Sequence, residues 1–175
     1  MGMDAYQRII SLRAVRHFTD QPIPDATLLR ILEAARWTGS AKNTQPWQFV
    51  VVRERQRLKS LAQCGRYASH VAGAALAVVV VTPPGYALFD AGRVTQNMML
   101  AAWMDGVGSC IASFHEEERV RALLGIPDGY VGHTGVSFGY PQANAPQTIE
   151  GQPREAVLAS IGRRPLSELV HWETW

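Results

Sequence analysis

The run LAVVVVT at residues 76–82 places the strongest constraint on how this chain can fold. Its four consecutive valines are β-branched, which favours a strand. Both faces of that strand are apolar, so it has to be buried on both sides. The residues Pro-Pro-Gly at 83–85 then end it. The fold therefore needs helices on both faces of a sheet that contains this strand.

Segments with helical spacing of apolar residues alternate with further strand patterns along the chain. Asp25 is expected to cap one of the helices. Helices are predicted over 3–12, 25–37, 54–63, 88–105 and 116–124, and strands over 48–53, 76–82, 106–114 and 133–141. This alternation predicts a single domain over residues 1–175, of the α/β or α+β class.

Composition excludes several classes of protein. Of 175 residues, 47% are apolar and 18% charged, which is typical of a globular chain. The net charge is +2 without a Lys/Arg block, so no nucleic-acid partner is expected. We see no signal-peptide core and no apolar run of membrane-span length, so a cytoplasmic location without membrane association is predicted. Cys64 and Cys110 lie outside any paired or metal-binding spacing and are expected to be buried free thiols.

Familiar catalytic motifs are missing from the sequence. There is no GxSxG elbow and no GxxxxGK[ST] phosphate loop, and GVGSCIAS at 106–113 lacks the third glycine of a dinucleotide fingerprint. The five histidines are scattered, so each is predicted to be a surface or capping residue and no metal site is expected. If the chain is an enzyme, we expect a cofactor rather than a catalytic side chain to do the chemistry.

The stretch SAKNTQPWQFVVV, residues 40–52, crowds hydrogen-bonding side chains between a helix and a strand. Trp47 is expected to pack in the core, with Pro46 fixing the turn before the strand. Asn43 has two interpretations: a turn residue that satisfies its own backbone, or a ligand-binding residue.

Arginines occur in pairs near both ends of the chain. Arg13 and Arg16 follow the first helix pattern, and Arg163 and Arg164 precede Pro165. One interpretation is two solvated basic turns. The other is a single anion site, because guanidinium groups suit the several acceptor oxygens of a phosphate monoester.

Four stretches in order resemble the motifs of the nitroreductase family over almost the whole chain. They are SLRAVRHF, ARWTGSAKNTQPWQFVVV, LAAWMDGVGSCIASF with LLGIPDGYVGHTGVSFGYP, and GRRPLSELV. The resemblance implies an α+β sandwich with a mixed central sheet flanked by helices. It also implies an intertwined homodimer with FMN at the interface. NADH or NADPH would reduce the flavin, which would pass electrons to a nitro compound, a quinone or a similar small acceptor in a ping-pong reaction.

Matching those motifs residue by residue implies a set of cofactor-binding positions. Ala14 lies within the first motif. In the second, Ser40 and Asn43 match positions that hydrogen-bond the flavin from the partner subunit, and Gln45 is placed to support that loop. In the third, Ala112 and Ser113 match the pair whose backbone faces the flavin, an N–H there pointing at N5. Phosphate contacts are implied for Arg13, Arg16 and Arg163, with Arg164 as second choice.

The sequence departs from the family pattern at several positions. Leu12 and Ala14 stand where an Arg and a Ser are usual, and each loses a donor worth about 1.5–3 kcal/mol if charge-assisted. An Asn-x-x-Lys pair near the flavin pyrimidine is replaced by a region offering Arg66 or His70. Two alternatives therefore stay open: a flavin enzyme of this fold with other chemistry, such as dehalogenation or flavin fragmentation, and a non-catalytic flavin-binding protein.

Overall fold

The computed structural model describes residues 4–85, 87–143 and 162–175, which fall into two compact units. The smaller unit holds helix α1 (Ala5–Ser11) and, near the C-terminus, the short 3-10 helix η3 (Leu166–Glu168). The larger unit begins at Leu12 and contains the sheet and the other helices. That residues 1–175 act as a single domain stays a prediction.

Within the described residues the sheet has four strands, in the order β1-β2-β4-β3. They are β1 (Gln48–Val52), β2 (Leu76–Thr82), β3 (Gly108–Ser113) and β4 (Val131–Gly139), and each neighbouring pair is antiparallel. Among the described strands, the expected mixture of directions is reduced to one isolated parallel bridge, between Ala14 and Ser109. All seven residues of β2 are buried, which confirms the central strand predicted over 76–82.

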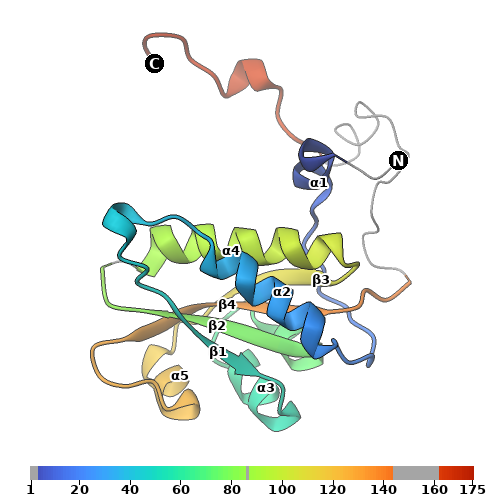
Figure 1. The fold of residues 1–175 in the computed structure, drawn as a ribbon, viewed down its shortest axis with the longest axis vertical. Coiled ribbons are helices and arrows are strands. Elements are labelled where there is room, and N and C mark those ends of the chain that lie inside the picture. The colour runs from blue at the N-terminus through green and yellow to red at the C-terminus, as the bar shows by residue number, and fades with distance from the viewer. Residues whose placement is uncertain (1–3, 86, 144–161) are drawn as a thin grey trace. The chain divides into compact units, whose positions relative to one another are not determined.

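Helices α2 (Asp25–Arg36) and α4 (Ala87–Met104) cover one face of the sheet (Figure 1). Successive strand residues point to opposite faces. Leu76, Val78 and Val80 of β2 accordingly pack in the cluster under these helices, together with Ile31 of α2 and the predicted core residue Trp47.

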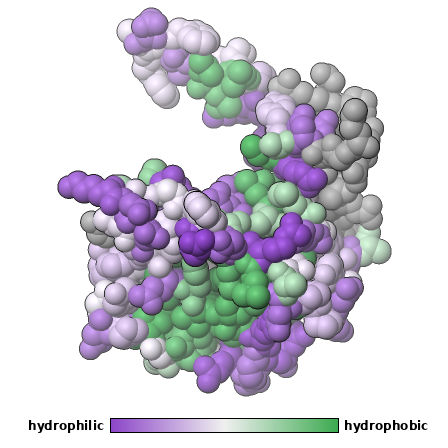
Figure 2. All heavy atoms as spheres, viewed as in Figure 1, coloured by the Kyte–Doolittle hydropathy of each residue, from purple (hydrophilic) through white to green (hydrophobic). Residues whose placement is uncertain are grey.

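Helices α3 (Arg55–Ala62) and α5 (Glu117–Leu124) and the 3-10 helix η2 (Ser69–Gly73) lie on the other face of the sheet (Figure 1). Ala77, Val79 and Val81 of β2 pack there against Leu58 and against Cys64, which is buried as predicted. Figure 2 shows an apolar area where β1 forms the front edge between the two helix layers.

Local chemistry accounts for the helix ends. The Glu54 carboxylate caps α3 by accepting hydrogen bonds from the N–H groups of Gln56 (2.7 Å) and Arg57 (2.9 Å). The prediction that Asp25 is a cap was wrong. The capping position of α2 is Pro24, and Asp25 lies in the first helical turn, where it forms an ion pair with Arg53 (2.7 Å).

No helix within the described ranges is both long enough and apolar enough to cross a membrane.

The packing of α3 against the sheet can be tested by truncating Leu58, which is completely buried on that helix. Leu58→Ala should lower the free energy of unfolding by about 2–5 kcal/mol, because the site loses apolar burial and gains a cavity. Lys59→Ala is the matched control, since Lys59 is exposed on the same helix and its truncation should cost no more than about 0.5 kcal/mol. Equal losses in urea denaturation would contradict this assignment of the core.

Candidate functional site

The outer edge of β3 carries backbone groups that point away from the sheet. The Phe114 N–H donates to the His133 carbonyl of the neighbouring strand (2.8 Å), whereas the Ser109 carbonyl accepts from Val15 on the other side (2.8 Å). Backbone direction alternates along an antiparallel strand, so Ser109, Ile111 and Ser113 direct their N–H and C=O groups outward. The side chains of Ile111 and Ser113 are also exposed. This edge therefore offers backbone donors to a ligand.

Ala112 and Ser113, whose backbone was predicted to face the flavin, point in opposite directions. Ala112 is 2% exposed and packs in the cluster under α3 and α5. By the same alternation its N–H faces β4. Ser113 faces outward, so of the two residues it is the one placed to present an N–H to a flat ligand beside the strand.

The segment after α1 crosses the beginning of β3. Val15 is completely buried there and lies so close to Gly108 that a Cβ on the glycine would be 2.7 Å from the Val15 Cβ. Glycine is therefore required at 108. Ala14 and Arg16 are exposed at this crossing. Burial raises the pKa of the Cys110 thiol and the Arg16 guanidinium opposes that rise, which places Arg16 beside β3.

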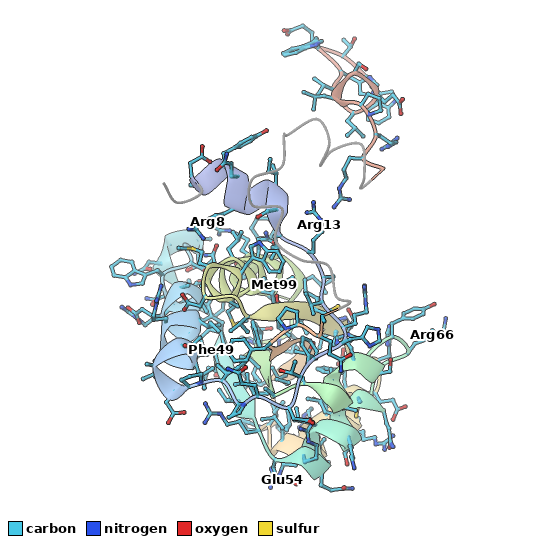
Figure 3. The ribbon with its side chains drawn as sticks, turned by 90° about the vertical axis from the view of Figure 1, so that its right-hand side faces the viewer. Arg8, Arg13, Phe49, Glu54, Arg66 and Met99 are labelled. Atoms are coloured by element: carbon cyan, nitrogen blue, oxygen red, sulfur yellow. The ribbon has the colours of Figure 1, made fainter. Side chains whose placement is uncertain are left out.

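The other predicted phosphate contacts are placed differently. The Arg13 guanidinium donates through Nη1 to the carbonyl of Leu12 (2.8 Å), and Figure 3 shows this side chain close to the segment that follows α1. Arg163 and Arg164 are exposed residues of the smaller unit. Their convergence with Arg13 and Arg16 on one anion stays a prediction.

His70 was predicted to be a surface or capping residue, and that prediction was wrong, because the side chain is 6% exposed and the residue lies inside a 3-10 helix. η2 places the ring under the sheet, with Nδ1 2.8 Å from the Ser137 hydroxyl of β4. Nε2 is buried without a hydrogen-bond partner among the described residues. Burial lowers the pKa of His70, Arg16 lowers it further, and the Ile111 carbonyl acts in the opposite direction. A neutral imidazole therefore lies beside Arg16. The detectable signal was Ser137, a polar residue between the apolar residues Val136 and Phe138.

The junction at 40–47 is a tight loop around the 3-10 helix η1 (Ala41–Asn43). The Ser40 hydroxyl oxygen accepts the backbone N–H of Gln45 (2.9 Å). Lys42, Asn43 and Gln45 have φ angles of 51°, 55° and 47°. Left-handed backbone costs a non-glycine residue about 1–2 kcal/mol, so strain is concentrated here, as is common at ligand-binding sites.

Two residues of α4 that the sequence did not single out form hydrogen bonds with the residues just before this loop. Asn97 donates through Nδ2 to the buried Thr38 hydroxyl (2.7 Å), and Arg93 donates through Nη1 to the Gly39 carbonyl (2.5 Å). They are four residues apart and so share a helix face. Their spacing of four residues within a mostly apolar helix was the available signal.

The predicted residues thus form two separate groups within the larger unit. Arg16 and Ser113 belong to the β3 edge, whereas Ser40, Asn43 and Gln45 belong to the loop before β1. β1 and β3 are the two outer strands. Three strand spacings of 4.7–4.9 Å put those edges about 14 Å apart. One copy of the chain does not bring the two groups together.

A hollow of about 460 Å³ lies beside the end of β3. Residues 63–67 and residues 115–116 line it. The N–H groups of His115 (2.8 Å) and Glu116 (3.1 Å) both donate to the Cys64 carbonyl and join the two segments. A Cβ on Gly65 would lie 2.3 Å from the Ser113 carbonyl oxygen, so this loop packs directly against the strand end.

Comparison with known proteins identifies the fold and the family. The family model described as "Nitroreductase family" matches residues 9–82 and 66–140. The chain belongs to the nitroreductase family. An Archaeoglobus fulgidus protein, provisionally named NADH dehydrogenase/NAD(P)H nitroreductase, is 35% identical over 150 residues, which cover 79% of this chain and 86% of that protein.

Two solved structures confirm the nitroreductase-type α+β sandwich. A nitroreductase family protein of Clostridium difficile 630 superposes with a TM-score of 0.83 at 23% identity, covering 99% of this chain and 100% of that one. An FMN-dependent nitroreductase of C. difficile R20291 gives 0.81 at 21% identity, with 97% and 99% covered. The family match includes the β3 edge and the 40–47 loop and ends before Arg163.

The buried His70 should make stability depend on pH. Its folded-state pKa is lowered, so as pH falls the unfolded chain takes up the proton first, starting near the ordinary histidine value of about 6.5. The free energy of unfolding should therefore fall below that pH and continue to fall until the folded-state pKa is passed. His70→Gln removes the titrating ring and should flatten the dependence between about pH 7.5 and about pH 5.5 in urea denaturation.

His17→Gln is the matched control for that measurement, because His17 is exposed. It should retain the wild-type dependence. If His70→Gln also retained the full dependence on pH, the assignment of a buried neutral His70 would be wrong.

Proposed function

We propose that this chain forms a homodimer that binds FMN and uses NADH or NADPH to reduce a nitro compound, a quinone or a similar small acceptor. The observation that carries the proposal is the outward edge of β3 with Arg16 beside it. The names of the relatives support it, because one solved neighbour is an FMN-dependent nitroreductase and the A. fulgidus relative carries NAD(P)H nitroreductase in its name.

The residues present fit a flavin mononucleotide. Arg16 and Arg13 supply cationic donors for the phosphate, with Arg163 and Arg164 as further candidates. The outward backbone groups at Ile111 and Ser113 suit the ring, because a flat ring with acceptor atoms can lie along a strand edge. Bound FMN would supply hydride transfer between the nicotinamide and the acceptor.

The contribution of the strand edge is a fixed electrostatic one. A backbone N–H at Ser113 is held by the sheet and does not titrate. Such a donor is already in place when electron density increases at the atom it faces, so no reorganisation is needed at that moment. No acid–base side chain is required for this role, in keeping with chemistry carried by a cofactor.

The 40–47 loop is proposed to come from the second copy of the chain. The Ser40 oxygen accepts the Gln45 N–H, so its own hydroxyl proton is left to donate elsewhere. The Asn43 side-chain amide has no hydrogen-bond partner within the described structure and is exposed. A partner copy can present these groups to the β3 edge, which the loop of the same chain is too far away to serve.

Exposed apolar side chains on the α2–α4 layer also favour a dimer. Trp37, Phe89 and Leu29 are 75%, 76% and 65% exposed. Large apolar side chains gathered on one layer are typical of a surface that another protein covers. A second copy of the chain would bury them while delivering its loop.

The redox proposal predicts that the FMN-loaded protein loses its oxidised flavin absorbance when NADH or NADPH is added without oxygen, and regains it on addition of a nitroaromatic or a quinone. Initial rates at several acceptor concentrations should give parallel double-reciprocal lines, as a ping-pong reaction requires. FMN that binds yet stays oxidised would favour a non-catalytic flavin-binding protein. That alternative was raised because Leu12 and Ala14 replace the usual Arg and Ser. Reduction without turnover of either acceptor would favour other flavin chemistry.

The shared site predicts a specific result for mixed dimers. Arg16→Gln removes a charged donor and should weaken FMN binding by about 1.5–3 kcal/mol. Asn43→Ala should weaken it by about 0.5–1.5 kcal/mol. A heterodimer of the two variants, isolated with two different affinity tags, should then hold one FMN site of native affinity and one site with both defects. Fluorescence titration should show these as two classes of site.

Two weakened sites, one with the affinity of the Arg16→Gln homodimer and the other with that of the Asn43→Ala homodimer, would mean that Arg16 and Asn43 serve the same flavin from the same chain. The homodimers of each variant are the controls, since both of their sites should be weakened equally. A monomer in solution that binds FMN at full affinity would rule out the shared site altogether.

A further inference from the structure

We propose that the hollow formed by residues 63–67 and 115–116 binds the electron acceptor by an acidic group, and that Arg66 makes the enzyme prefer anionic aromatic acceptors. This rests on the proposed function, because it places the acceptor next to a flavin on the β3 edge. It adds a substrate class and a specificity-determining residue to that reaction.

The position of the hollow is the first step. Gly65 packs on the Ser113 carbonyl, and His115 follows Ser113 by two residues. The hollow therefore begins where the outward edge of β3 ends. A molecule in it would adjoin any flat ring lying along that edge. Its volume of about 460 Å³ falls within the range of small-molecule sites, about 300–1,000 Å³.

The charge of the hollow is the second step. Its one carboxylate, Glu116, is engaged by the Arg119 guanidinium (3.0 Å), whose other nitrogen donates to the Gln63 side chain (2.7 Å). Arg66 has no ion-pair or hydrogen-bond partner anywhere in the described ranges, and Figure 3 shows it projecting outward. The charge of the Glu116 carboxylate is thus balanced by Arg119, whereas the charge of Arg66 is not balanced. The hollow therefore favours a negatively charged ligand.

The kind of anion follows from the neighbouring side chains. A guanidinium is a planar donor that binds a carboxylate through two parallel hydrogen bonds. The Tyr67 ring is 79% exposed at the rim and can cover the flat face of an aromatic ligand. The imidazole of His115 lies edge-on to that of His133, with centroids 6.2 Å apart. An aromatic carboxylate satisfies the cation and the exposed ring together.

The redox step balances with the proposed electron donor. For a nitro acceptor, ArNO2 + NAD(P)H + H⁺ gives ArNO + NAD(P)⁺ + H2O. Two electrons break one N–O bond, and the oxygen leaves as water. The acidic group on the ring is unchanged, so it can anchor the substrate throughout.

The test compares 4-nitrobenzoate with 4-nitrobenzamide, which share the ring and the nitro group and differ in charge. For the FMN-loaded wild-type enzyme, kcat/KM should be about tenfold higher for the acid, and Arg66→Gln should bring the ratio close to one. Arg57→Gln is the matched control: Arg57 is an exposed arginine of nearby α3 that lies 3.9 Å from Glu54, and its loss should leave the ratio unchanged.

A second readout does not depend on turnover. Benzoate, which has no nitro group, should bind the oxidised FMN-loaded protein in calorimetry about tenfold more tightly than benzamide, and Arg66→Gln should abolish that difference. If neither NADH nor NADPH reduces the flavin, the proposed function fails, and benzoate binding still tests the hollow.

Three results would overturn the inference while leaving the proposed function intact. One is a ratio near one in the wild-type enzyme. Another is an equal loss for both acceptors in Arg66→Gln, accompanied by weaker FMN binding, which would assign Arg66 to the flavin. The third is a change confined to the KM of NADPH, which would assign it to the electron donor.

Discussion

The structure depends on the burial of β2 from both sides. A strand with apolar residues on both faces stabilises the protein only when two helix layers cover it, one over Val78 and Val80 and the other over Val79 and Val81. With β1 and β4 beside it, β2 occupies the interior of the sheet. β3 and β1 consequently become the outer strands, and the groups that bear on function lie at these two edges.

An unpaired strand edge is normally a hazard, because its free N–H and C=O groups can recruit another chain. Here the exposed length of β3 is short. Val15 pairs with the strand at Ser109, and the Gly65 loop packs on the carbonyl of Ser113. Ile111 and Ser113 remain available between these two contacts. The edge is therefore long enough to bind a flat ligand and too short to be a good template for another strand.

Much of this arrangement could be predicted from local patterns. The β-branched run predicted the limits of β2, and helical spacing predicted α4 to within a residue at each end, because both signals are repeated many times.

Prediction failed where the role of a single residue depends on distant parts of the chain. Asp25 looked like a cap, yet Pro24 takes that place and Asp25 pairs with Arg53, 28 residues away in the chain. His70 lies in a five-residue 3-10 segment that is too short to show periodicity. The directions of the Ala112 and Ser113 backbone groups depend on the register between β3 and β4. The sequence of β3 alone does not determine that register.

The strained loop before β1 links the fold to the proposed shared site. Left-handed backbone at Lys42 and Gln45 is unfavourable without glycine, and it persists only where the surroundings over-determine it. Arg93 and Asn97 of α4 hold Gly39 and Thr38 at the start of the loop, while Asn43 within it is exposed. Flexible side chains on a relaxed loop would lose entropy on binding a ligand. A loop already fixed in this way has lost that freedom during folding, so its exposed side chains can engage a flavin on the partner's β3 edge at a smaller entropic cost. The strain at 42–45 is in this sense part of what prepares the loop for binding.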